Sequence, residues 1–149
     1  MAPPGAPTGP DGAAEPAGDA AGTRCLGIVE RAYRGALEKQ FFDELYLSVE
    51  LHRQLGGLDL LLRGQAVGYA AAAATVPELR FGKRTVATLS DHRRDLATLL
   101  ENGVRVLAEE SSLAAYLPGG ADRLVPGVVP VADGALAVRW PEYRLVFFV

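Results

Sequence analysis

Residues 58–65, LDLLLRGQ, decide the fold class of this chain. The mostly apolar run 58–62 stands between Gly56-Gly57 and Arg63-Gly64, which is typical of a strand buried on both faces. The small residues 66–74 follow almost at once and predict a helix that ends before Pro77. A buried strand that runs into a helix is the repeating unit of a parallel α/β sheet.

The rest of the chain repeats this alternation of apolar runs and helical segments. Apolar residues in steps of four predict a helix from about Ala36 to Leu55, and Ser90 is expected to cap another that has Asp91 in its first turn and ends at Asn102-Gly103. The other expected elements are strands at 25–29, 104–108 and 145–149, a short helix at 112–116, and a short edge strand at 128–131, where Pro130 excludes a central position. We therefore predict an α/β fold, a three-layer sandwich around a mostly parallel sheet of about five strands with right-handed crossovers.

The composition changes once, at about residue 23. Residues 1–23 are almost all Ala, Pro and Gly, with three acidic residues, no basic residue and no aromatic residue. Such a segment buries too little apolar surface to offset its ordering entropy, so we expect a disordered tail at 1–23 and one α/β domain at 24–149. The tail has neither the basic start nor the apolar stretch of a signal peptide.

The charge balance argues against two classes of partner. The chain has 15 basic and 18 acidic residues, and the three acids of the tail leave 15 of each in residues 24–149. A neutral domain lacks the basic surface of a nucleic-acid binder or of a protein attracted to anionic lipid. No apolar stretch reaches the ~18 residues that a membrane span needs. We expect neither a nucleic acid nor a membrane among the partners.

The single cysteine, Cys25, limits the chemistry further. It excludes an internal disulfide and a cysteine-based metal cluster, and it suits a reducing cytoplasm, so we expect a cytoplasmic protein. Its place at the amino end of the first strand predicts packing as a small apolar residue. His52 and His92 have no ligand spacing, so we expect no metal; His52 is expected to pack against the sheet or a partner.

Cofactor motifs are absent from the sequence. Residues 81–85, FGKRT, contain a Gly-Lys pair but lack the upstream glycine and the spacing of a phosphate-binding loop. Gly27 stands alone in the first strand, so the dinucleotide fingerprint is missing as well. We therefore expect no cofactor.

Polar residues follow each of the three best-defined strands. In open parallel sheets, ligands bind outside the carboxyl ends of the strands, where residues far apart in sequence meet. Such a rim could hold a small polar or anionic ligand, with the amides of helix starts contributing. The alternative is that these are solvated strand ends with ordinary surface ion pairs. The candidate ligand-binding residues are Glu30 and Arg31, Arg63 and Gln65, and Glu109 and Ser111.

The first helix carries more apolar residues than one sheet face requires. Projected at 100° per residue, its apolar arc exceeds half of the circumference, whereas a helix on a sheet needs a stripe of only ~100° or somewhat more. The surplus predicts a second buried surface. We expect a homo-oligomer assembled through this helix; a neighbouring helix of the same chain is the alternative cover.

The order of these segments resembles the DsrE-like family, the fold of the DsrE/DsrF/DsrH and TusB/TusC/TusD sulfur-relay proteins. The resemblance covers residues 24–149. It rests on the segments CLGIVE, DLLLRGQAVGYAAAA, LATLLENGVRVLAEE and LVPGVVPV and on the terminal RLVFFV. It implies a compact cytoplasmic α/β subunit that assembles into dimers, trimers or hexamers and, in active members, carries a persulfide on a cysteine near the strand ends.

This sequence departs from that family pattern. Neither GQAVGYAAAA nor EESSLAAY contains a cysteine, and Ser111 or Ser112 cannot form a persulfide. The first hypothesis is therefore a non-catalytic oligomeric protein that binds a small ligand or a partner. The second is a sulfur-relay or redox protein that uses Cys25. The third is a hydrolase or transferase that uses Glu30, Arg63 and Glu109.

Overall fold

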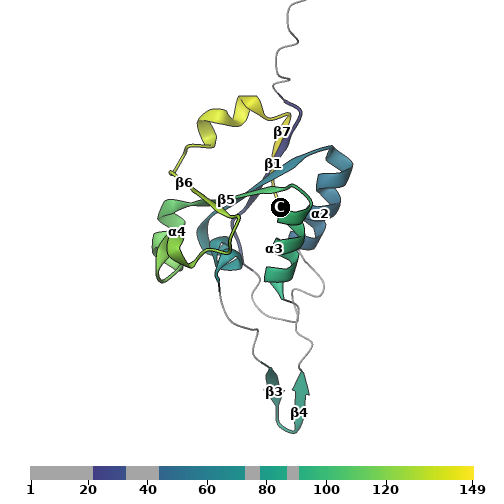
Figure 1. Cartoon of the computed structure of the whole chain (residues 1–149), viewed down its shortest axis with the longest axis vertical. Coiled ribbons are helices and arrows are strands. Elements are labelled where there is room, and N and C mark those ends of the chain that lie inside the picture. Colours follow the sequence, from purple (N-terminus) through teal and green to yellow (C-terminus); the bar gives the residue numbers. More distant parts are fainter. Residues whose placement is uncertain (1–21, 33–43, 73–77, 87–90) are drawn as a thin grey trace, which may run out of the picture.

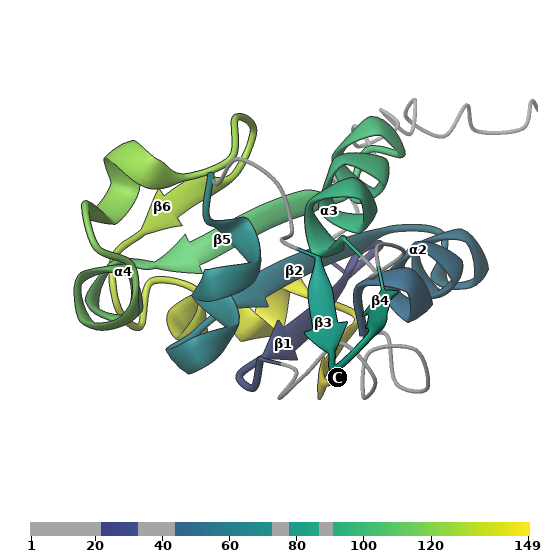
Figure 2. The same ribbon diagram turned by 90° about the horizontal axis from the view of Figure 1, so that it is seen from below.

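The centre of the molecule is a five-stranded sheet in which every pairing is parallel. The computed structural model describes residues 22–32, 44–72, 78–86 and 91–149. The strand order is β6-β5-β2-β1-β7, and Figure 2 shows β6, β5, β2 and β1 in this sequence. The strands are β1 Cys25–Val29, β2 Leu58–Leu62, β5 Arg105–Glu109, β6 Val129–Val131 and β7 Leu145–Phe148.

The two central strands have the bounds that the apolar runs predict. All five residues of β1 and all five of β2 are buried, as expected for strands covered on both faces. They pair in register from Cys25 opposite Leu58 to Val29 opposite Leu62. β5 begins one residue later than predicted, and β6 is an edge strand as Pro130 required.

The helices divide unequally between the two faces of the sheet. One face packs against α2 (Glu44–Leu55), α3 (His92–Glu101), α4 (Glu110–Tyr116) and the 3-10 helix η1 (Gly64–Ala70), which together bury the larger core. The other face carries a smaller core of Leu26, Ile28, Leu61 and Leu136, covered by the chain around η3 (Ala137–Glu142). Figure 1 shows η3 and the α3–α4 pair on opposite sides of the sheet.

Chain direction explains this division. From β1 through β2 and β5 to β6 the chain advances toward one edge of the sheet, and from β6 to β7 it returns to the other edge. A right-handed crossover that reverses direction must pass over the opposite face. The return segment carries η3, which is why this face is covered by a short helix.

Three helix starts differ from the sequence prediction, and one of them is that of α4, which begins at Glu110 and not at residue 112. The segment expected as a helix from Ala66 is a 3-10 helix that begins two residues earlier, at Gly64. Asp91, expected inside the first turn of α3, is instead its N-cap and accepts a hydrogen bond from the Arg93 amide at 3.0 Å. The predicted cap, Ser90, lies outside the described residues, as do residues 1–21 of the expected tail and 36–43 of the expected first helix.

His52 closes the turn between α2 and β2. Its Nδ1 accepts a hydrogen bond from the Leu58 amide at 3.0 Å. The side chain therefore satisfies a backbone donor at the start of the central strand, which is more specific than the packing role expected from the sequence.

A two-stranded antiparallel hairpin was not foreseen. β3 (Leu79–Phe81) and β4 (Arg84–Val86) pair around a turn in which Gly82 has a φ of +57°. Figure 1 draws this hairpin apart from the parallel sheet. The Gly-Lys pair of residues 81–85 therefore forms the turn of this hairpin. The turn needs a left-handed backbone at residue 82, which glycine adopts more easily than other residues.

Candidate functional site

The polar residues predicted at the strand ends meet around Arg63. This residue follows β2 directly, and its Nε lies 3.2 Å from a carboxylate oxygen of Glu30 after β1. The same Nε lies 3.5 Å from Glu109 Oε2 at the end of β5. Parallel pairing in register brings these three residues together although they are up to 79 positions apart in the sequence.

A cavity of about 390 Å³ opens on one side of Arg63. Arg63, Glu109 and Ser111 line its polar part. Its floor includes Leu61 and Leu136, both buried in the core of the second sheet face. The cavity is therefore apolar below and charged at its rim, the usual combination in small-molecule sites.

The remaining predicted residues line a separate hollow. Glu30, Arg31 and Gln65 surround an open depression of about 410 Å³, with Tyr116 of α4 beside them. Glu30 and Arg31 are both exposed. The six candidates thus divide into two groups of three on either side of the Arg63–Glu30 ion pair.

The sequence did not point to Asp133 and Trp140, which also line the cavity. Asp133, in the turn after β6, accepts a hydrogen bond from the Ser111 amide at 3.0 Å, and Trp140 of η3 forms part of the wall. The hydrogen bond from Ser111 and then the positive charge of Arg63 hold the pKa of Asp133 below its usual value. No local signal marks either residue, because both reach the strand ends only through the return crossover over the second face.

Ser112 ties β2, η1 and α4 together behind the cavity. Its hydroxyl accepts a hydrogen bond from the Gly64 amide at 2.8 Å and donates a long one, 3.5 Å, to Glu109 Oε2. The Ser112 side chain is buried. Gly64 has a φ of +56°, and a Cβ atom added to it would lie only 3.1 Å from the carbonyl oxygen of Glu30. A glycine is therefore needed at this position to bring the ends of β1 and β2 close together.

The opposite, amino-terminal end of the sheet holds a buried carboxylate. Asp59 of β2 is fully buried and pairs with Arg24 and Arg105, and it accepts a hydrogen bond from the Tyr143 hydroxyl at 3.1 Å. Burial by itself raises the pKa of Asp59, but the hydrogen bonds and charges of Arg105 and Arg24 outweigh it, so the pKa lies below its usual value. All of these polar partners belong to the same chain, so the charge of Asp59 is balanced without a ligand.

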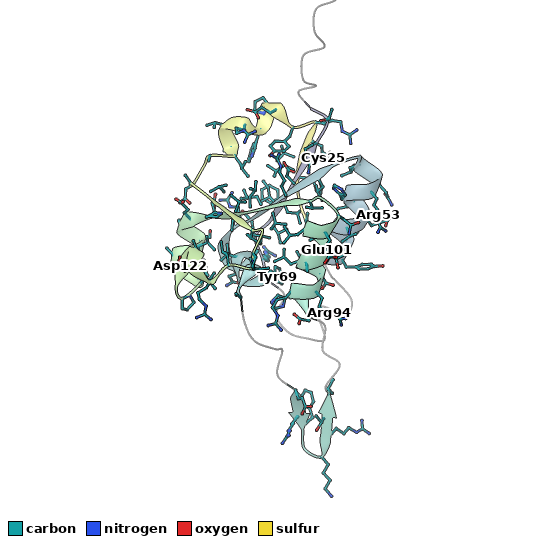
Figure 3. The ribbon with its side chains drawn as sticks, in the orientation of Figure 1. Cys25, Arg53, Tyr69, Arg94, Glu101 and Asp122 are labelled. Carbon is teal, nitrogen blue, oxygen red and sulfur yellow. The ribbon has the colours of Figure 1, made fainter. Side chains whose placement is uncertain are left out.

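Cys25 lies near this amino-terminal end. Its side chain is fully buried, and the Arg144 guanidinium reaches its Sγ at 3.5 Å. Figure 3 places Cys25 on the other side of the body from Asp122, which follows α4. The burial agrees with the packing role expected from the sequence.

The described residues contain neither a metal-binding cluster nor a membrane-spanning helix. No group of three or more His, Cys, Asp and Glu side chains in the described part of the chain could hold a metal ion. Likewise, among the described helices none combines the length and the apolar character required to span a bilayer.

The parallel five-stranded sheet with helices on both faces defines an open-sheet α/β protein. No protein-family model matches the sequence, and no curated protein matches it. Among solved structures, the crystal structure of the ychN protein from E. coli matches with a TM-score of 0.58 at 19% sequence identity, over 86% of this chain and 99% of that chain. This similarity supports the α/β fold expected from the sequence, a parallel sheet of five strands flanked by helices. At this identity it shows the fold alone.

Proposed function

We propose that this chain is a non-catalytic, cytoplasmic, DsrE-like protein that binds a small molecule in the cavity beside Arg63. The observation that carries the proposal is this cavity of about 390 Å³, with an apolar floor and a charged rim, at the carboxyl edge of the sheet. Ligands of open parallel sheets bind at this edge. The only cysteine of the chain lies elsewhere and is buried, so no thiol is available here for group transfer.

Filling the cavity tests the proposal. Ala137 lines the cavity and is exposed, so Ala137→Phe places a ring in the space without disturbing the core. Ala114→Phe, an equal change at an exposed position of α4, is the matched control. A panel of small aromatic fragments of each charge type is screened by ligand-observed NMR. We expect fragment binding that Ala137→Phe abolishes and the control retains. Binding that survives Ala137→Phe would place the ligand outside this cavity.

A sulfur-relay or redox role through Cys25 is the second candidate. The resemblance to the DsrE-like family favours it, whereas the burial of Cys25 opposes it, because a thiolate must reach its acceptor to react. Thiol labelling with and without denaturant separates the two. If Cys25 is structural, it reacts only after unfolding. Rapid native labelling, or a sulfur adduct on the freshly purified protein, would favour the relay. The hydrolase or transferase hypothesis gains no further observation from the structure.

We further propose that the protein assembles into a homo-oligomer through its first helix. Among the described residues of α2, Leu45 and Val49 are buried in the core, whereas Tyr46 and Leu47 are exposed. The exposed pair supports the second buried surface expected from the apolar arc.

A further inference from the structure

The surroundings of Arg63 contain more negative charge than positive charge. Glu30 and Glu109 both form ion pairs with this single guanidinium, and Asp133 lies close enough for Arg63 to lower its pKa. The cavity itself is thus lined by two carboxylates and one guanidinium, and Glu30 binds this guanidinium from outside the cavity. The amide of Ser111, which could have bound an anion, is already bonded to Asp133. An anionic ligand would have to enter against this surplus.

Of the carboxylates around Arg63, Glu109 has the longest polar contacts. Its side chain is only 13% exposed, yet both of its polar contacts are long, 3.5 Å to Arg63 Nε and 3.5 Å to the Ser112 hydroxyl. Both contacts fall on Oε2. Arg63 lies closer to Glu30, at 3.2 Å. A carboxylate this deeply buried is stabilised when a strong donor reaches it, and the cavity is the open side from which such a donor can come.

The lining of the cavity also includes residues that suit an apolar or aromatic group. Trp140 contributes its side chain there and is 40% exposed, and Leu61 and Leu136 form the floor. An indole face attracts cations as well as aromatic rings. The cavity therefore offers both carboxylates and apolar surface, within a space suited to a small organic molecule.

We propose that the ligand of this cavity is a small organic amine, whose ammonium group binds between Glu109 and Asp133 and whose apolar body lies against Trp140. The inference rests on the proposed function and specifies its ligand class. It replaces the polar or anionic ligand expected from the sequence by a cationic one. Arg63 stays bound to Glu30 and neutralises that carboxylate.

Three probes of the same shape and different charge test this inference. They are 2-phenylethylamine, which is cationic at pH 7, the neutral 2-phenylethanol and the anionic 3-phenylpropionate. Trp140 is the only tryptophan of the chain, so its fluorescence reports binding at this wall directly. We expect the amine to bind about tenfold or more tightly than the anion, a difference that shrinks as salt is added.

Two isosteric variants assign the charge preference to its residue. Glu109→Gln should reduce the preference for the amine over the alcohol by about tenfold, whereas Glu110→Gln, at an exposed position next to it, should leave the preference unchanged. Equal loss in both variants would overturn the role of Glu109. Tighter binding of the alcohol or of the anion would overturn the amine class while leaving the cavity as a binding site. Failure of all three probes to bind would overturn the proposed function as well.

Discussion

Asp59 shows how one buried carboxylate can hold the amino-terminal end of the sheet. It has no exposed surface, and Arg24, Arg105 and Tyr143 converge on it from three different segments of the chain. The desolvation of a carboxylate is costly unless it is paired, so these partners are what permits the charge inside β2. The sequence run LDLLL does not predict this cluster. Its apolar residues indicate only that the strand is buried, and the partners of Asp59 lie far away in the sequence.

Replacing Asp59 by Asn keeps the shape and removes the charge. The two guanidiniums lose their ionic partner but still reach solvent, with side chains 35% and 55% exposed. We therefore expect a loss of about 2 kcal/mol in the free energy of unfolding, below the 3–5 kcal/mol or so typical of a fully buried pair. Urea denaturation at pH 7 measures it. Asp122→Asn, at an exposed aspartate, should change stability little, and an equal loss there would contradict the assignment.

The same residue predicts how stability depends on pH. Because the pKa of Asp59 is lower in the folded state than in the unfolded chain, its contribution is complete above the unfolded value of about 3.9. The contribution is lost as the pH falls below that value and through the folded pKa. Asp91 and Asp133 also have lowered pKa values and act in the same window. Asp59→Asn should therefore flatten the acid decline of stability without abolishing it; an unchanged slope would contradict this.

Whether a site residue could be predicted from the sequence depended on whether it directly follows a recognisable strand. Glu30, Arg63 and Glu109 could be placed together because each directly follows a recognisable buried strand, and the parallel register brings such residues to one edge. Asp133 and Trp140 could not, since they lie in irregular chain after the short edge strand. The proposal of a cationic ligand, in place of the polar or anionic one expected from the sequence, depends on these two residues.

At the level of elements, Gly27 lets the backbone of β1 lie close to the side chains of Leu60 and Val149. A Cβ at this position would lie 2.9 Å from Leu60 Cδ2 and 3.2 Å from Val149 Cγ2. Leu60 is fully buried and has little room to rotate away. The sequence analysis treated this glycine only as a failed nucleotide-binding signature, whereas the structure gives it a packing role.

Gly27→Ala should therefore destabilise the protein by about 1–2 kcal/mol through overpacking. Gly68 in η1 provides a control with the same chemical change, because a Cβ there meets nothing within 4 Å and the backbone is not left-handed. We expect Gly68→Ala to be neutral or slightly stabilising. Thermal and urea unfolding of both variants measure the difference; equal effects would show that space at β1 is not limiting.

The elements themselves were predictable to different degrees for physical reasons. β1 and β2 were found with their observed bounds because full burial produces an unbroken apolar run. The β3–β4 hairpin was missed because each strand has three residues, too few for a period to emerge, and β4 carries no buried residue. The 3-10 form of η1 has no compositional signal that separates it from an α-helix.

At the scale of the whole molecule, the exposed apolar residues of α2 are the part of the fold that bears on the proposed assembly. Leu47 is 50% exposed on a helix whose Leu45 and Val49 pack into the core. A stable interface buries ~800 Å² on each partner, with its energy concentrated in a few apolar residues near the centre. Leu47 stands where such a residue is needed if α2 meets a second copy.

We expect native mass spectrometry of the full chain to show a homo-oligomer that Leu47→Arg converts to monomer. A charge placed within an apolar contact must be desolvated without a partner, which costs enough to dissociate a moderate interface. Ala114→Arg adds the same charge at an exposed position of α4, on another helix, and should leave the assembly intact. Circular dichroism of both variants must match the wild type, so that dissociation reflects the interface and not the fold. A wild-type chain that stays monomeric at micromolar concentration, or a variant Leu47→Arg that still assembles, would contradict assembly through this face and leave the ligand cavity to act within a single subunit.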